Sequence, residues 1–158
     1  MSFDTSRERA PRYIRAPQTP DDRMISTEPR LQHLYLSHLA PAFDFGAFKL
    51  ILDVSRLRNP AAGISGALVF DGERFCQLLD GPQAAVQALI DRLGTDKRHV
   101  GLTVLHSSSN PTAKPLQGWS NGYCGANDLD VFAGDDGLRG VAALAAFVAI
   151  VAGSDMSD

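Results

Sequence analysis

Two apolar runs on either side of the Asp71-Gly72 pair constrain the fold of this chain most. The first run, GISGALVF, ends at Phe70, and the second, ERFCQLL, begins at Glu73. An Asp-Gly pair between two such runs is typical of a two-residue β-hairpin loop, in which both central residues take a positive φ. The sequence therefore predicts an antiparallel pair of strands near the middle of the chain.

A strand and a helix are expected before this hairpin. The run LQHLYLSHL, which starts at Leu31, alternates in polarity as a strand does. Asp44 can cap the helix that follows, because its side chain can accept hydrogen bonds from the first free N–H groups. Pro60 is expected to lie just past the end of that helix, since proline cannot continue it.

A second helix and further strands are expected after the hairpin. Gly81-Pro82 opens the helix, and Gly94 ends it. Strands are predicted at 102–105 and at 119–124. The order β-α-β-β-α-β is the split-βαβ arrangement. We therefore predict an α+β fold, a ferredoxin-like mixed sheet with an additional fifth strand and a C-terminal helical extension.

The pattern divides the chain into a flexible N-terminal tail (1–30), a folded domain (31–126) and a helical extension (127–158). The tail is rich in proline and charge and poor in large apolar groups. The longest apolar stretch, 141–152, would form a helix of about 18 Å, too short for a bilayer core of about 30 Å. We expect this helix to cover an exposed sheet face, with formation of a homodimer as the alternative.

The composition excludes several classes of function. A net charge of −3 supplies no overall basic field, so neither nucleic acid nor a membrane surface is expected as a partner. The two cysteines, Cys76 and Cys124, are far apart in the sequence, which is typical of reduced thiols in a cytoplasmic protein. We find no phosphate-binding glycine loop, no metal-ligand cluster and no serine nucleophile motif, and we therefore expect neither a metal nor an enzyme.

Two polar side chains lie in the middle of apolar strands. Tyr35 is central in the first strand, and Gln77 is flanked by apolar residues in the third. These strands are neighbours in the predicted fold, so the phenol and the amide can meet on one face. The pair could read the edge of a heteroaromatic ring, or it could be a hydrogen bond that only satisfies two buried groups.

Asn59 and the basic run Lys97-Arg98-His99 have two interpretations each. Asn59 is either an ordinary residue of a helix end or a ligand-binding amide. The basic run is either a solvated loop or a phosphate clamp, since a guanidinium group matches phosphate geometry.

Four stretches together resemble one known family. They are LYLSHLA, SRLRNPAAGISGALVFDGERFCQLLDGP, TDKRHVGL and GWSNGY. In order and spacing they are similar to the BLUF domain, which senses blue light with a flavin. The resemblance extends from Leu31 to Tyr123, and the long second stretch is its most specific part.

The resemblance implies a bound flavin, usually FAD, with FMN or riboflavin as alternatives, between the two helices and the sheet. By position, Tyr35 matches the redox-active tyrosine of the family, Gln77 its switching glutamine, and Asn59 an asparagine that binds the ring. The positions that match further contacts to the flavin are Ile51, Arg58, Arg98 and His99.

The implied function is a blue-light photoreceptor. Electron and proton transfer between Tyr35, Gln77 and the flavin would rearrange the hydrogen bonds around the ring, and the signal would pass to an unidentified downstream protein. Trp119 and Asn121 match positions that transmit the signal, although the family usually has a methionine at the second. Asn121 is therefore expected to compete for Gln77. A ferredoxin-like interaction module that has lost the photocycle is the alternative function.

Overall fold

The computed structural model describes residues 28–158 of the protein. The predicted tail lies outside the described residues except for 28–30, and Arg30 is already the first residue of a strand. The described elements, in chain order, are β1 (Arg30–Leu39), α1 (Phe45–Ala61), β2 (Ser65–Phe70), β3 (Arg74–Pro82), α2 (Gln83–Thr95), β4 (His99–Ser109), β5 (Trp119–Tyr123), the 3₁₀ helix η2 (Asp128–Phe132), α3 (Gly140–Gly153) and β6 (Asp155–Ser157).

The strands form one six-stranded sheet in the order β4-β1-β3-β2-β5-β6. β1 pairs antiparallel with β3 and β4, and β3 pairs antiparallel with β2, which is the predicted ferredoxin-like arrangement. The predicted fifth strand is also confirmed, and it pairs parallel with β2. The sequence analysis missed β6, a strand too short to show a polarity pattern.

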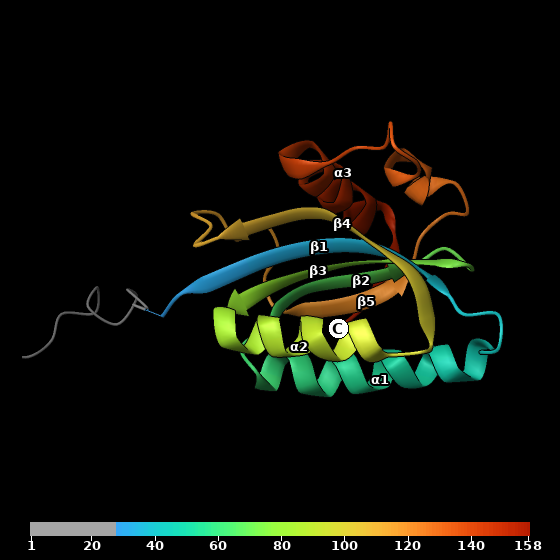
Figure 1. The fold of residues 1–158 in the computed structure, drawn as a ribbon, viewed down its shortest axis with the longest axis horizontal. Helices are drawn as coiled ribbons and strands as arrows, with labels where there is room; N and C mark the ends of the chain where they lie inside the picture. The colour runs from blue at the N-terminus through green and yellow to red at the C-terminus, as the bar shows by residue number, and fades with distance from the viewer. Residues whose placement is uncertain (1–27) are drawn as a thin grey trace, which may run out of the picture.

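The two faces of the sheet carry different helices. Figure 1 shows α1 and α2 together on one face and α3 on the other. Alternation along β1 separates two cores, because Leu34 and Leu36 belong to the core on the α3 side and Leu31 to the core on the α1–α2 side, where Tyr35 lines the pocket. The central strands are thus buried on both faces, whereas most residues of the edge strand β4 are exposed. The strand residues Tyr35 and Gln77 lie under α1 and α2.

The C-terminal apolar stretch covers the sheet, as predicted. Ala143 and Phe147 of α3 are fully buried against Leu34, Leu78 and other residues of this core. Within residues 28–158, no helix has the length and apolar character needed to cross a membrane. Formation of a homodimer stays a prediction.

Two expectations about local structure are wrong. The hairpin turn is centred one residue later, because the Asp71 carboxylate accepts hydrogen bonds from the N–H groups of Glu73 and Arg74. Gly72 takes φ 104°, but Asp71 does not have a positive φ. In addition, α1 continues through Pro60, since the N–H of Ala62 closes the last turn onto the carbonyl groups before the proline.

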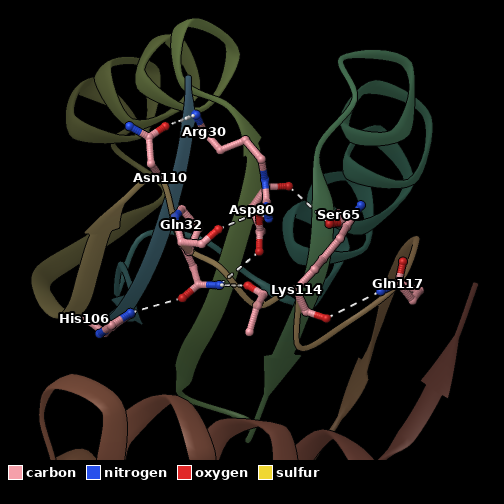
Figure 2. A network of polar contacts seen from close by, with 10 residues as sticks. Arg30, Gln32, Ser65, Asp80, His106, Asn110, Lys114 and Gln117 are labelled. Carbon is pink, nitrogen blue, oxygen red and sulfur yellow. Dashed lines mark hydrogen bonds and ion pairs between the residues drawn. The ribbon is translucent and has the colours of Figure 1, made fainter. Parts of the chain in front are cut away.

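A buried polar network fixes the end of the sheet where β1 begins and β3 ends (Figure 2). Asp80 is 1% exposed and forms an ion pair with Arg30. Its other oxygen accepts a hydrogen bond of 3.0 Å from Gln32, whose amide oxygen accepts one of 3.1 Å from Nε2 of His106. The network ties β1, β3 and β4 together, so it sets the alignment of the strands that carry Tyr35 and Gln77.

Candidate functional site

Tyr35 and Gln77 meet in the middle of the sheet. They are direct cross-strand partners in the β1–β3 register. The Tyr35 hydroxyl donates a hydrogen bond to Oε1 of Gln77, and the two residues are only 3% and 4% exposed. The predicted convergence of a phenol and an amide on one sheet face is therefore confirmed.

The surroundings of Tyr35 keep it protonated. Burial raises its pKa well above the ordinary value, and the nearby Cys76 and Asp96 raise it further. A neutral phenol donates its hydrogen bond to Gln77, so the amide oxygen of Gln77 points toward the Tyr35 hydroxyl.

A pocket opens next to this pair, between α1, α2 and the sheet. Its inner part has a volume of about 410 Å³, and Tyr35, Gln77, Asn59 and Ile51 line it. An overlapping outer part of about 570 Å³ also contains Ile51 and Asn59 and reaches Arg58.

Two buried polar atoms of the inner pocket have no hydrogen-bond partner among the described residues. They are Nδ2 of Asn59 and Oγ of Ser37. Burial lowers the pKa of His99, so its ring offers one donor and one acceptor. Unpaired buried groups are costly, and a heteroaromatic ring with donors and acceptors on its edge would satisfy them. The residues of the pocket therefore fit a flavin.

The basic residues at the mouth of the pocket behave differently from one another. Arg58 and Arg92 line the outer part. Arg98 lines it too, but its guanidinium group is held by the Asp96 carboxylate, with Nη2 2.6 Å from Oδ2. That hydrogen bond lowers the pKa of Asp96. Arg98 therefore positions Asp96 here, and a phosphate would have to share or replace this contact.

Trp119 and Asn121 lie on β5, outside the pocket. Asn121 is in the same cross-strand row as Gln77, but Leu68 of β2 stands between them. The Asn121 amide donates a hydrogen bond of 3.1 Å to the carbonyl group of Leu52 in α1. The expected competition of Asn121 for Gln77 is therefore not observed, because its amide is directed toward α1.

The sequence analysis missed part of the pocket. Ser37 could have been found, since it lies two residues after Tyr35 on one strand and so shares its face. Asp96 is close to the predicted basic run, but nothing in the sequence showed that its carboxylate would hold Arg98. The other residues missed are Ser55, Leu68, Phe75, Leu89 and Leu93 in the inner part and Val54 and Arg92 in the outer part.

Comparison with known proteins gives a consistent assignment. Residues 31–122, more than half of the 158-residue chain, match the BLUF family, described as sensors of blue-light using FAD. The chain is 28% identical over 72 residues to the "Blue light- and temperature-regulated antirepressor BluF" of Escherichia coli (strain K12). That match covers 46% of this chain and only 18% of the relative.

Solved structures show the same fold. The dark-state structure of BlrB, a BLUF protein, is 26% identical with a TM-score of 0.56, over 67% of this chain and 80% of BlrB. The ground state of BlsA is 22% identical with a TM-score of 0.57, over 65% of this chain and 70% of BlsA. With the family match, the aligned fold and a pocket that fits a flavin, the chain belongs to the BLUF family of FAD-using blue-light sensors.

Proposed function

We propose that this protein is a blue-light receptor whose switch is the hydrogen-bond pair Tyr35–Gln77. The observation that carries the proposal is the buried hydrogen bond from the Tyr35 hydroxyl to Oε1 of Gln77 at the inner end of the pocket. The unpartnered amide of Asn59 on the facing helix supplies the third polar group.

The bound flavin supplies blue-light absorption and reversible uptake of one electron. Tyr35 gives up one electron, and its hydroxyl proton moves along the hydrogen bond to Oε1 of Gln77. When the electron and the proton return to Tyr35, the oxidation states are restored, and the Gln77 amide is left in a second arrangement. The site is buried, so water cannot replace a missing hydrogen bond. Each of the two arrangements of the Gln77 amide therefore persists only if it satisfies every polar group around it.

The other residues of the pocket hold the cofactor. Asn59, whose Nδ2 group is free, would donate a hydrogen bond to the ring edge, and Ile51 would pack against the ring. Arg58 and Arg98 line the outer part of the pocket, where the flavin tail would leave, whereas His99 lines the inner part. We propose FAD as the natural cofactor, with FMN and riboflavin bound through the same ring contacts.

The signal passes to another protein in this proposal. The Escherichia coli relative is described as an antirepressor, which supports regulation through a partner. We propose that Trp119 and Asn121 of β5 transmit the change at Gln77, since Asn121 lies in its cross-strand row. A cytoplasmic location and a function without enzymatic activity stay predictions.

Absorption spectra in the dark and under blue light test the proposal. The flavin-loaded protein is expected to shift its visible band reversibly to the red. Tyr35→Phe is expected to keep the flavin and lose the shift, whereas the matched control Tyr123→Phe, outside the pocket, is expected to keep both. Bound flavin with no light-induced change in the unsubstituted protein would instead support the interaction module that has lost its photocycle.

A further inference from the structure

The outer side of α1 carries an apolar stripe that the domain itself does not bury. Leu50, Val54 and Leu57 are 58%, 37% and 76% exposed, and no described element lies over this side of the helix (Figure 1). Their spacing of four and three residues places them on one side of the helix. Phe48, about two and a half turns before Leu57, lies on the opposite side and is buried in the core. α1 therefore has one apolar side for its own domain and a second one that faces outward.

The stripe has the spacing and the residue types of a two-stranded coiled-coil seam. In the heptad notation abcdefg, Leu50 and Leu57 occupy d positions, and Val54 occupies the a position between them. A β-branched residue at a with leucine at d favours a parallel pair of helices. Single apolar residues scattered over a surface are ordinary, whereas three in a continuous seam indicate that another helix packs here.

The charges beside the seam favour a second copy of α1 as that helix. In the same notation Asp53 is at g and Arg58 is at e, one on each side of the seam, and both side chains are exposed. Neither forms an ion pair within residues 28–158. In a parallel pair, a g residue lies next to the e residue five positions later on the other helix. Asp53 of each copy would therefore face Arg58 of the other.

The alternative orientation of the two helices brings like charges together. An antiparallel pair places g next to g and e next to e, so Asp53 would face Asp53 and Arg58 would face Arg58. The parallel pair also avoids the cost of forming a helix, because α1 is already folded in each copy. A seam of about two turns makes a small interface, so the association is expected to be reversible.

We propose that two copies of this protein associate in parallel through the outer side of α1. The interface lies at the mouth of the flavin pocket, because Val54 and Arg58 also line its outer part. The second copy would thus place its Asp53 carboxylate next to the pocket. The proposal goes beyond the photocycle and depends on no step of it. Loss of the association would leave the light-induced red shift, and loss of the red shift would leave the association.

Sedimentation equilibrium of the full-length, flavin-loaded protein in the dark tests the interface. A reversible monomer–dimer equilibrium is expected. Leu57→Gln places a good helix former at the seam and is expected to weaken the dimer about hundredfold, because each dimer loses two buried leucine side chains. Val141→Gln is the matched control and is expected to leave the dimer unchanged, since Val141 is also 76% exposed but belongs to α3, at the opposite face of the sheet.

Charge reversals test the parallel pairing. Asp53→Lys and Arg58→Glu each place like charges together twice in a dimer, and each is expected to weaken it about tenfold. An equimolar mixture of the two variants is expected to dimerise as the unsubstituted protein does, because each copy supplies the charge that the other lacks. Arg58 also lines the flavin pocket, so the visible flavin band is used to match the flavin occupancy of all samples.

Five results would overturn the proposal. They are the absence of a dimer at concentrations up to about 1 mM, an unchanged dimer in Leu57→Gln, and a mixture of the two charge variants that dimerises no better than each variant alone. A dimer that Leu57→Gln weakens and both single charge reversals leave unchanged would contradict the parallel orientation. A dimer that Val141→Gln weakens and Leu57→Gln does not would assign the association to α3.

Discussion

Removal of the Tyr35 hydroxyl measures how much its hydrogen bond to Gln77 contributes to the free energy of unfolding. Tyr35→Phe leaves Oε1 of Gln77 buried and without its donor, since Gln77 is only 4% exposed. An unpaired buried group of this kind costs about 1–3 kcal/mol. A loss of about 2 kcal/mol lowers the urea midpoint by about 1 M when the slope is about 2 kcal/mol/M.

Strong coupling between Tyr35 and Gln77 is expected in a double-mutant cycle of unfolding free energies. Gln77→Leu leaves the Tyr35 hydroxyl unpaired and also costs about 1–3 kcal/mol, whereas the double variant removes both partners and avoids an orphaned group. We expect a coupling free energy of about 1–2 kcal/mol from urea unfolding at one fixed flavin concentration, because bound ligand adds to stability. The cycle of Tyr123→Phe with Gln77→Leu is the control, in which the two losses of unfolding free energy are expected to add. Costs that add to within about 0.5 kcal/mol in the Tyr35–Gln77 cycle would refute the reasoning.

Three further predictions concern the sheet, the pocket and the dependence on pH. Phe147→Ala is expected to lower the free energy of unfolding by about 3–5 kcal/mol, because the ring is fully buried under the sheet; a loss below about 1 kcal/mol in denaturant unfolding would contradict this packing. Asn59→Leu is expected to weaken FAD binding about tenfold in a fluorescence titration, through loss of one hydrogen bond to the ring; equal affinity would remove Asn59 from the site. Burial raises the pKa of Tyr35 above its unfolded value of about 10, so the folded state retains the proton at higher pH, and this contribution to stability is constant below about pH 10 and is lost above it. Tyr35→Phe is expected to flatten that alkaline decline in unfolding free energy, and identical slopes would count against the raised pKa.

The centre of the site was predictable because it depends on the regular alternation of side chains between the two faces of a strand. Tyr35 and Gln77 each sit in the middle of an apolar run, and the β-α-β-β-α-β order makes their strands neighbours. The hairpin was predicted at the correct place but with the wrong central residues. The Asp71 side chain binds two N–H groups after it, and this local competition moves the turn by one residue.

The surroundings of the site depend on tertiary contacts that no pattern in the sequence indicates. Asn121 was expected near Gln77, but β2 separates the two and α1 offers the Leu52 carbonyl instead. From the residues alone, Arg98 was expected in either a solvated loop or a phosphate clamp, and no pattern showed that the Asp96 carboxylate would hold its guanidinium group. These outcomes depend on which helix packs over which strand and on loop geometry, so they follow from the structure alone.

An infrared light-minus-dark difference spectrum tests the central claim most directly. The protein is loaded with FAD and carries glutamine labelled with ¹³C at the side-chain carbonyl, and its spectrum is compared with that of the unlabelled protein. A label-sensitive carbonyl band is expected to appear with the red-shifted state and to decay with it, because the Gln77 amide changes its hydrogen bonds. A red shift without any label-sensitive band would contradict the switch at Gln77.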